Sequence, residues 1–164
     1  MNTPALILIA ALIPSQGAGA TKAPASEHQH QVDKNGDQAM GFSHEKTTHH
    51  FLLRADGGVI QVDANSADDR ESRDQIQSHL GHIAKMFAAG NFNTPMLVHS
   101  VTPPGTAAMA KLKADLKYSY EASPRGGRVV IATANQEALA AVHEFLRFQI
   151  KDHNTGDSLT IGAK

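Results

Sequence analysis

The chain has 164 residues, of which 41% are hydrophobic and 19% charged, and its formal net charge is −1. That length suits one sizeable globular domain and is too short for two. The near-neutral charge leaves no basic footprint for nucleic acid, and an aromatic content of 5% argues against a base-stacking surface. Because there is no cysteine, disulfides, Fe–S clusters, cysteine nucleophiles and thiolate zinc sites are excluded.

The first 20 residues are typical of a signal peptide. Residues 5–13 form an uninterrupted apolar run, which is much shorter than the ~20 apolar residues that span a bilayer. Ala18 and Ala20 are small residues at the positions that a signal peptidase reads, so we expect cleavage after Ala20. The sequence therefore predicts a periplasmic or secreted protein with no membrane span after cleavage. No Lys or Arg precedes the apolar run, which leaves an apolar arm or a membrane anchor as the alternative.

The rest of the chain divides by composition. Residues 21–39 are polar and almost free of apolar side chains, which is typical of a disordered linker. We expect a single folded domain over residues 40–153. Residues 154–164 are predicted to be a flexible tail.

Two segments of the domain share one order of elements. Residues 50–65 and residues 118–135 each contain a strand, a Gly-Gly turn and a second strand, and each is followed by a helical pattern. The glycine pairs are hairpin signals, because glycine accepts the positive φ of tight turns. This correspondence predicts an internal duplication. Two ordinary ββα units with similar turns are the alternative.

Apolar periodicity predicts the helices. One helix is expected over residues 67–89 and another over residues 136–152, since apolar residues recur three and four apart in both. Asn65 and Asn135 stand near their starts, as capping residues do. A third helix is expected over residues 106–115, and a possible short strand over Pro95–Val101. The sequence therefore predicts an α+β two-layer sandwich, in which two ββα-like units form one antiparallel sheet and helices cover one of its faces.

Histidine is the residue type that points to function. The chain has ten histidines, and imidazole is the commonest metal ligand among side chains and titrates near neutrality. Five of the ten fall into two tight groups and are the predicted metal ligands: His44, His49, His50, His79 and His82.

The first group lies at the entry to a strand. Because side chains alternate across a strand, His49 and His50 should face opposite sides, so a regular strand cannot easily offer both to one ion. Either of them could join His44, with Glu45 as a possible oxygen ligand, second-shell acceptor or general base. The alternative is that these histidines are solvated or pair within the sheet.

The second group lies on a helix. His79 and His82 are three residues apart and are therefore neighbours on one face, which Met86 extends. Two imidazoles and a thioether suit copper, and His99 could approach either group. The alternative is a boundary histidine, a surface histidine and a core methionine. We expect His143 to have a packing role and His153 to lie at a helix C-terminus, where a partial positive charge is favoured.

Signatures of catalysis are missing. The sequence has no Gly-rich phosphate loop, no Gly-x-Ser-x-Gly elbow and no His-Glu-x-x-His helix. The question of an enzyme stays open, with a binding protein favoured.

The opening Met-Gly-Phe-Ser-His-Glu-Lys-Thr-Thr-His-His-Phe at residues 40–51 and the run His-Ile-Ala-Lys-Met-Phe at residues 82–87 resemble a group of small exported bacterial proteins. The resemblance covers residues 40–153 and implies one exported domain. Some members carry the name of an aspartate carbamoyltransferase. This chain has no Ser-x-Arg-Thr loop for carbamoyl phosphate and is too short for two catalytic domains, so the resemblance transfers no catalytic residue.

Together these features predict an exported protein that binds copper or zinc through clustered histidines. The alternative is a metal-free module of the cell envelope that binds a small ligand or a protein and has structural histidines. A homodimer is possible through exposed strand edges, but nothing in the sequence selects it.

Overall fold

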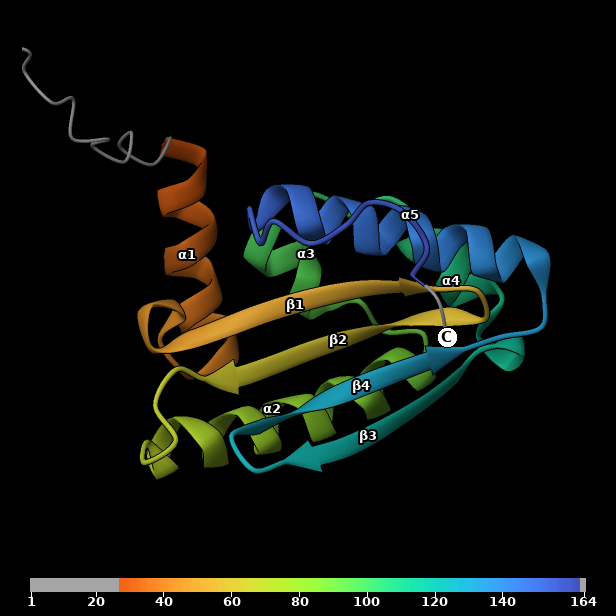
Figure 1. Cartoon of the computed structure of the whole chain (residues 1–164). Coiled ribbons are helices and arrows are strands. Elements are labelled where there is room, and N and C mark those ends of the chain that lie inside the picture. The colour runs from red at the N-terminus through yellow and green to blue at the C-terminus, as the bar shows by residue number, and fades with distance from the viewer. Residues whose placement is uncertain (1–26, 163–164) are drawn as a thin grey trace, which may run out of the picture.

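The computed structural model describes residues 27–162. The predicted signal peptide and the first part of the predicted linker lie outside these residues. The strands form one four-stranded sheet. Figure 1 shows helices packed against this sheet and the N-terminal helix standing at its end. The elements in chain order are α1 (Glu27–Met40), η1 (His44–Lys46), β1 (Thr47–Arg54), β2 (Gly57–Ala64), α2 (Arg70–Ala88), α3 (Asn93–His99), α4 (Thr106–Lys111), η2 (Lys113–Asp115), β3 (Lys117–Ser123), β4 (Gly126–Ala132) and α5 (Gln136–Asp152).

The sheet is antiparallel throughout, with strand order β1-β2-β4-β3. Both predicted hairpins form, but their two-residue turns are Ala55-Asp56 and Pro124-Arg125, and the Gly-Gly pairs are the first residues of β2 and β4. The glycines were therefore wrongly placed in the turns. They are needed for close packing, since a Cβ at Gly58 would lie 2.1 Å from Leu146 Cδ1 and a Cβ at Gly126 would lie 2.1 Å from the Val62 carbonyl oxygen. The inner strands β2 and β4 come from different hairpins, so the two ββα-like units occupy equivalent halves of one sheet. This symmetry is compatible with the predicted duplication, which itself stays a prediction.

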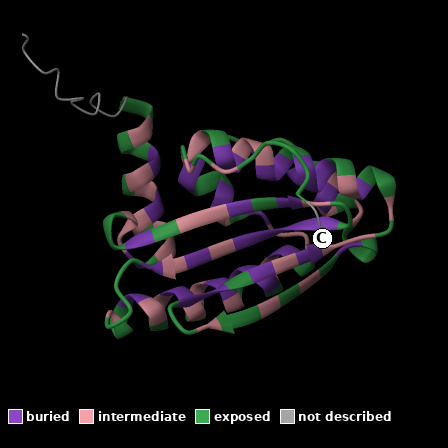
Figure 2. Ribbon diagram, viewed as in Figure 1, coloured by how far each residue is buried: buried purple, intermediate pink, exposed green. Residues whose placement is uncertain are grey.

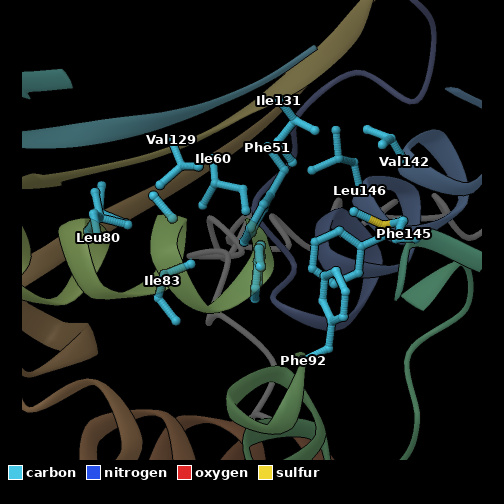
Figure 3. Packing of buried hydrophobic residues seen from close by; sticks show 14 of the residues in the cluster. Phe51, Ile60, Leu80, Ile83, Phe92, Val129, Ile131, Val142, Phe145 and Leu146 are labelled. Carbon is cyan, nitrogen blue, oxygen red and sulfur yellow. The ribbon is translucent and has the colours of Figure 1, made fainter. Parts of the chain in front are cut away.

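One face of the sheet carries the core. Phe51 pairs with Ile60, and Ile60 pairs with Val129, so their side chains share a face. Against that face pack α2, through residues such as Leu80, and α5, through residues such as Leu146 (Figure 3). Helix α2 lies mainly over β3 and β4, and α5 lies over β1 and β2, so each helix covers the hairpin of the other unit. The predicted α+β fold is confirmed.

The outer strands differ in burial. Figure 2 shows that β3 is mostly exposed, whereas β2 is mostly buried. The other outer strand, β1, is covered along its edge by the C-terminal segment. The Asp157 carboxylate accepts the Phe51 N–H at 2.9 Å, and the Gly162 N–H donates to the Leu53 carbonyl at 3.0 Å. Residues 154–162 were expected to belong to a flexible tail, but in the structure backbone groups of β1 bond to Asp157 and Gly162 of this segment.

Two further expectations were wrong. Residues 27–39 were expected to belong to a disordered linker, but they form most of α1, which buries Val32 and Gly36 and packs against α3. Pro95–Val101 was expected to include a short strand, but residues 93–99 form α3. Local composition did not predict either helix, because α1 and α3 pack against each other and this tertiary contact orders both segments.

The other helices lie close to their predicted positions. Helix α5 has the predicted bounds, and the Asn135 side chain caps it by accepting the N–H groups of Glu137 and Ala138. Helix α2 starts later than expected and is capped by Asp69, not by Asn65. The predicted third helix is divided into α4 and η2. Among the described residues, none of these helices is long and apolar enough to cross a membrane.

Candidate functional site: an imidazole-lined cavity

A small cavity of about 60 Å³ lies within the core at one end of the sheet. That volume holds a few water molecules or an ion, and it is far below the ~300 Å³ at which small-molecule sites begin. Its walls are mainly apolar but include one histidine from each of four regions of the chain. These are His49 of β1, His79 of α2, His99 at the end of α3 and His153 directly after α5.

The regular elements explain why these side chains converge. In β1, His49 alternates with Thr48 and His50 and so points to the core face beside Phe51. In α2, His79 lies next to the buried stripe that contains Ile76 and Ile83. His153 continues the buried stripe of α5, three residues after Ile150.

Two of the rings stack and a third meets them edge-on. The His49 and His153 rings are parallel within 3°, with centroids 5.7 Å apart. The His99 ring is nearly perpendicular to that of His153, at a centroid distance of 4.9 Å. Phe42 contacts the His79 ring edge-on at 5.6 Å. These aromatic contacts hold the imidazoles in a closely packed group.

The pKa values of His49, His79 and His153 lie well below the ordinary value of 6.5, so these three imidazoles are neutral at pH 7. Burial lowers the pKa of His49 and of His79 to about 4 each, and that of His153 to about 3. Repulsion from neighbouring imidazoles lowers these pKa values further, since a second positive charge in a buried group is unfavourable. An imidazole without its second proton keeps a lone pair for a hydrogen-bond donor or a metal ion.

Two polar atoms at this cavity lack partners among the described residues. The Nε2 atom of His49 is buried without a hydrogen bond, and so is the Nε2 atom of Gln149. An unsatisfied buried polar atom costs about 1–3 kcal/mol, so a site that leaves such atoms unpaired is a candidate for ligand binding.

His99 is different, because both of its ring nitrogens have partners. Its Nδ1 atom is 2.5 Å from Asp152 Oδ2, and its Nε2 atom is 3.0 Å from Gln149 Oε1. The other Asp152 oxygen accepts His28 Nε2–H at 2.7 Å. Burial alone would raise the pKa of Asp152, but the hydrogen bonds from the two histidines outweigh burial and keep the pKa below its usual value.

A wider groove leads to the cavity. It has a volume of about 400 Å³ and is bounded by α1 on one side and by the start of β1 and the end of α5 on the other. His49, His153 and Met40 line both the groove and the cavity. These three side chains therefore form the boundary between the polar groove and the apolar cavity.

Of the five predicted ligands, only His49 and His79 line the cavity, whereas His44 lines the groove together with His49. The Nδ1 atom of His44 is 3.0 Å from Asp37 of α1, and the Nδ1 atom of His50 is 2.9 Å from Asp157 of the C-terminal segment. His82 is exposed on α2, and its electrostatic effect lowers the pKa of His79. Strand alternation and helix periodicity thus place His50 and His82 away from the cavity.

The secondary candidates also separate. His99 does line the cavity. Glu45 is exposed on η1, and Met86 does not line the cavity but accepts Thr94 Oγ1–H at 3.9 Å. As expected, His143 has a packing role, since its Nε2 atom lies 2.9 Å from the Arg54 carbonyl and 3.1 Å from the Gly57 carbonyl.

His153, Met40 and Gln149 are the residues that sequence reasoning missed. A signal for His153 was present, because it extends the stripe of Leu146 and Ile150 at helical spacing. No comparable signal marks Met40, which reaches the site only because α1 packs at the end of the sheet.

Within residues 27–162 no three His, Asp or Glu side chains stand close enough to hold one ion. The site is thus a group of neutral imidazoles around a small cavity in an α+β sandwich. No protein-family model, curated protein or solved structure matches the chain.

Proposed function

We propose that this is an exported protein that binds a transition-metal ion, copper or zinc, through neutral histidines. The observation that carries the proposal is the buried Nε2 atom of His49, which lacks a partner beside the rings of His153 and His79. Metal ligation requires the unprotonated imidazole. The low pKa values of these three histidines keep that form populated well below neutral pH.

The proposed ligands differ from those expected from sequence. His49 and His79 are retained, His153 joins them, and His99 is a fourth imidazole held by Asp152. The thioether of Met40 at the same cavity replaces that of Met86. Imidazoles together with a thioether suit copper, and Cu(I) in particular, better than they suit harder ions.

Binding requires a small rearrangement of the rings. The nitrogen lone pairs of an imidazole lie in the plane of its ring, so parallel stacked rings do not both point to an ion between them. A rotation of the His49 or the His153 side chain would direct two nitrogens to one point. The cavity beside them supplies space for this rotation.

Export is supported by the apolar run at residues 5–13 and by the small residues that follow it. Both lie outside the described residues. An exported compartment is oxidising, and a site made of imidazoles avoids the thiols that oxidation would convert to disulfides.

The test is a binding measurement on the purified protein. Cu(I) and Zn²⁺ are each titrated in competition with a chelator of known affinity, and elemental analysis is done on protein taken from the export compartment. We expect about one ion per chain, with affinity reduced ~10-fold or more in His49→Ala and His153→Ala. His50→Ala is the matched control, since it removes the neighbouring imidazole from the opposite face of β1. A stoichiometry near zero with both metals, or equal affinity for His49→Ala and His50→Ala, would contradict the proposal.

A second candidate is metal-free binding of a small polar molecule in the groove. The specific observation in its favour is the groove itself, whose 400 Å³ falls within the usual range for small-molecule sites. Its walls offer the hydroxyl groups of Thr47, Thr48 and Thr155 and the amide of Asn154. If neither metal binds, ligand-induced shifts of the His49 and His153 NMR signals in a screen of small polar molecules would support this candidate.

A further inference from the structure

We propose that α1 is a lid over the groove, held closed by contacts of His28 and Asn35. One whole wall of the groove belongs to α1, through Val32, Asp33, Gly36 and Met40. Figure 1 shows the helix standing at the end of the sheet, outside the layer that α2 and α5 form. Movement of α1 away from the sheet would open the groove and expose His49 and His153.

The sequence of α1 has a low intrinsic helix propensity. Its 14 residues include Gly36, Asn35, two aspartates and two histidines, all of which are poorer helix formers than alanine or leucine. It buries only Val32 and Gly36. A short helix with so little apolar contact depends on its tertiary contacts and belongs to the least stable part of a fold.

Near its end, beside the hinge at Gly41, α1 is tied to η1 because Asp37 accepts the His44 N–H at 2.8 Å. Polar contacts at two further places hold the rest of α1 in position. Near its start, His28 Nε2–H donates to Asp152 at the end of α5. Near its middle, Asn35 Nδ2–H lies 3.2 Å from the Val98 carbonyl, 3.3 Å from the Leu97 carbonyl and 3.2 Å from Ser100 Oγ. These bonds join α1 to α3 and α5 without crossing the core.

The geometry also provides a hinge. Gly41 directly follows the helix, with φ +80°, and no atom lies within 4 Å of the position that a Cβ would take. Glycine in open space can change its backbone angles at little cost. The contact of Asp152 with both His28 of the lid and His99 of the cavity then links the closed position of α1 to the site.

The significance of the lid for binding depends on the proposed function, but the lid can be tested without any metal. Hydrogen exchange of the α1 amides and modification of histidines by diethylpyrocarbonate are measured on His28→Ala, Asn35→Ala and the double variant. We expect α1 exchange and the modification rates of His49 and His153 to rise together, by about two- to tenfold per lost contact. Amides of α2 and α5 should keep their wild-type rates.

His30→Ala and Lys34→Ala are the matched controls, because they make similar changes at exposed positions of the same helix. Both should behave as wild type. The lid is contradicted if His28→Ala and Asn35→Ala have the same α1 exchange rates as these controls. It is also contradicted if α1 amides exchange only at the rate of the core amides of α2 and α5. A third contradicting result is faster α1 exchange with no increase in the modification rates of His49 and His153. If α1 opens as expected but neither metal binds, the lid holds and the metal proposal fails. If a metal binds but the lid variants equal the controls, the metal proposal holds and the lid fails.

Discussion

At the scale of single residues, the ten histidines differ in what their ring nitrogens contact. Four have a carboxylate partner, one has two backbone carbonyl partners, and His30 and His82 lie exposed on helices. The remaining three, His49, His79 and His153, line the cavity, and the buried Nε2 atom of His49 has no hydrogen-bond partner in residues 27–162. Only a histidine of this last kind offers a free lone pair in a water-poor setting, so these three carry the proposed function.

The role of His143 can be tested by stability. Its Nε2 atom bridges the carbonyls of Arg54 and Gly57 at the turn between β1 and β2. His143→Ala should lower the free energy of unfolding by about 1–3 kcal/mol, because it removes a donor that buried carbonyl groups need. Urea denaturation measures the change. His82→Ala, at an exposed position, should stay within ~0.5 kcal/mol of wild type. Equal midpoints for the two variants would contradict the packing role.

At the scale of the elements, helix caps and close packing contacts decide which substitutions a helix or strand tolerates. Helices α2 and α5 begin at Asp69 and Asn135, whose side chains accept backbone N–H groups, whereas α1 lacks a long apolar stripe and depends on its neighbours. The hairpin between β1 and β2 brings Gly58 against α5 so closely that a Cβ there would lie 2.1 Å from Leu146 Cδ1. A glycine within α2 is less constrained.

Gly81 and Gly58 should therefore respond to alanine in opposite directions. At Gly81 of α2 the nearest atom to an added Cβ is Tyr120 Cδ1, at 3.9 Å. Gly81→Ala should stabilise the protein by about 0.5–1 kcal/mol, through the higher helix propensity of alanine. Gly58→Ala should destabilise it by about 1–3 kcal/mol, through overpacking against Leu146. Thermal and urea unfolding measure both. Destabilisation by Gly81→Ala would show that the ring of Tyr120 cannot accept the methyl group.

At the scale of the whole molecule, the buried imidazoles connect stability to pH. The folded state holds His49, His79 and His153 at pKa values of about 4, 4 and 3, whereas the unfolded chain has the ordinary value of 6.5. Between pH 6.5 and pH 4 the unfolded state therefore binds more protons than the folded state. By linkage, protons in that range favour unfolding.

Stability should be fully present above pH 6.5 and should fall as the pH drops towards 4. Each unit of pKa difference corresponds to about 1.4 kcal/mol, reduced here by solvent screening because the side chains are half-buried. Urea unfolding at pH 7.5, 6 and 5 measures the slope, and NMR titration measures the three pKa values. His153→Gln should flatten the slope, whereas His30→Gln should not. A stability that is level from pH 7.5 to pH 5 would contradict the neutral cluster.

The sequence by itself determined the local parts of this protein. Breaks between apolar runs indicated two hairpins, although the Gly-Gly pairs lie just after the turns and not in them. Apolar stripes indicated α2 and α5, because helix periodicity depends on neighbouring residues alone. Strand alternation correctly placed His49 and His50 on opposite faces. Of the site, His49 and His79 were predicted as ligands and His99 as a secondary candidate.

Only the tertiary structure decided what those parts bring together. The packing of α1 against α3 ordered a polar segment that local composition predicts to be disordered, and it brought Met40 to the cavity. Contacts with other elements kept two predicted ligands out of the cavity, since His44 contacts Asp37 of α1 and His50 contacts Asp157, which is 107 residues away in sequence. His153 entered the cavity for the same reason, since α5 ends beside the start of β1. Side chains from four separate regions converge only once the sheet and helices have packed, and no local pattern in the sequence contains that information.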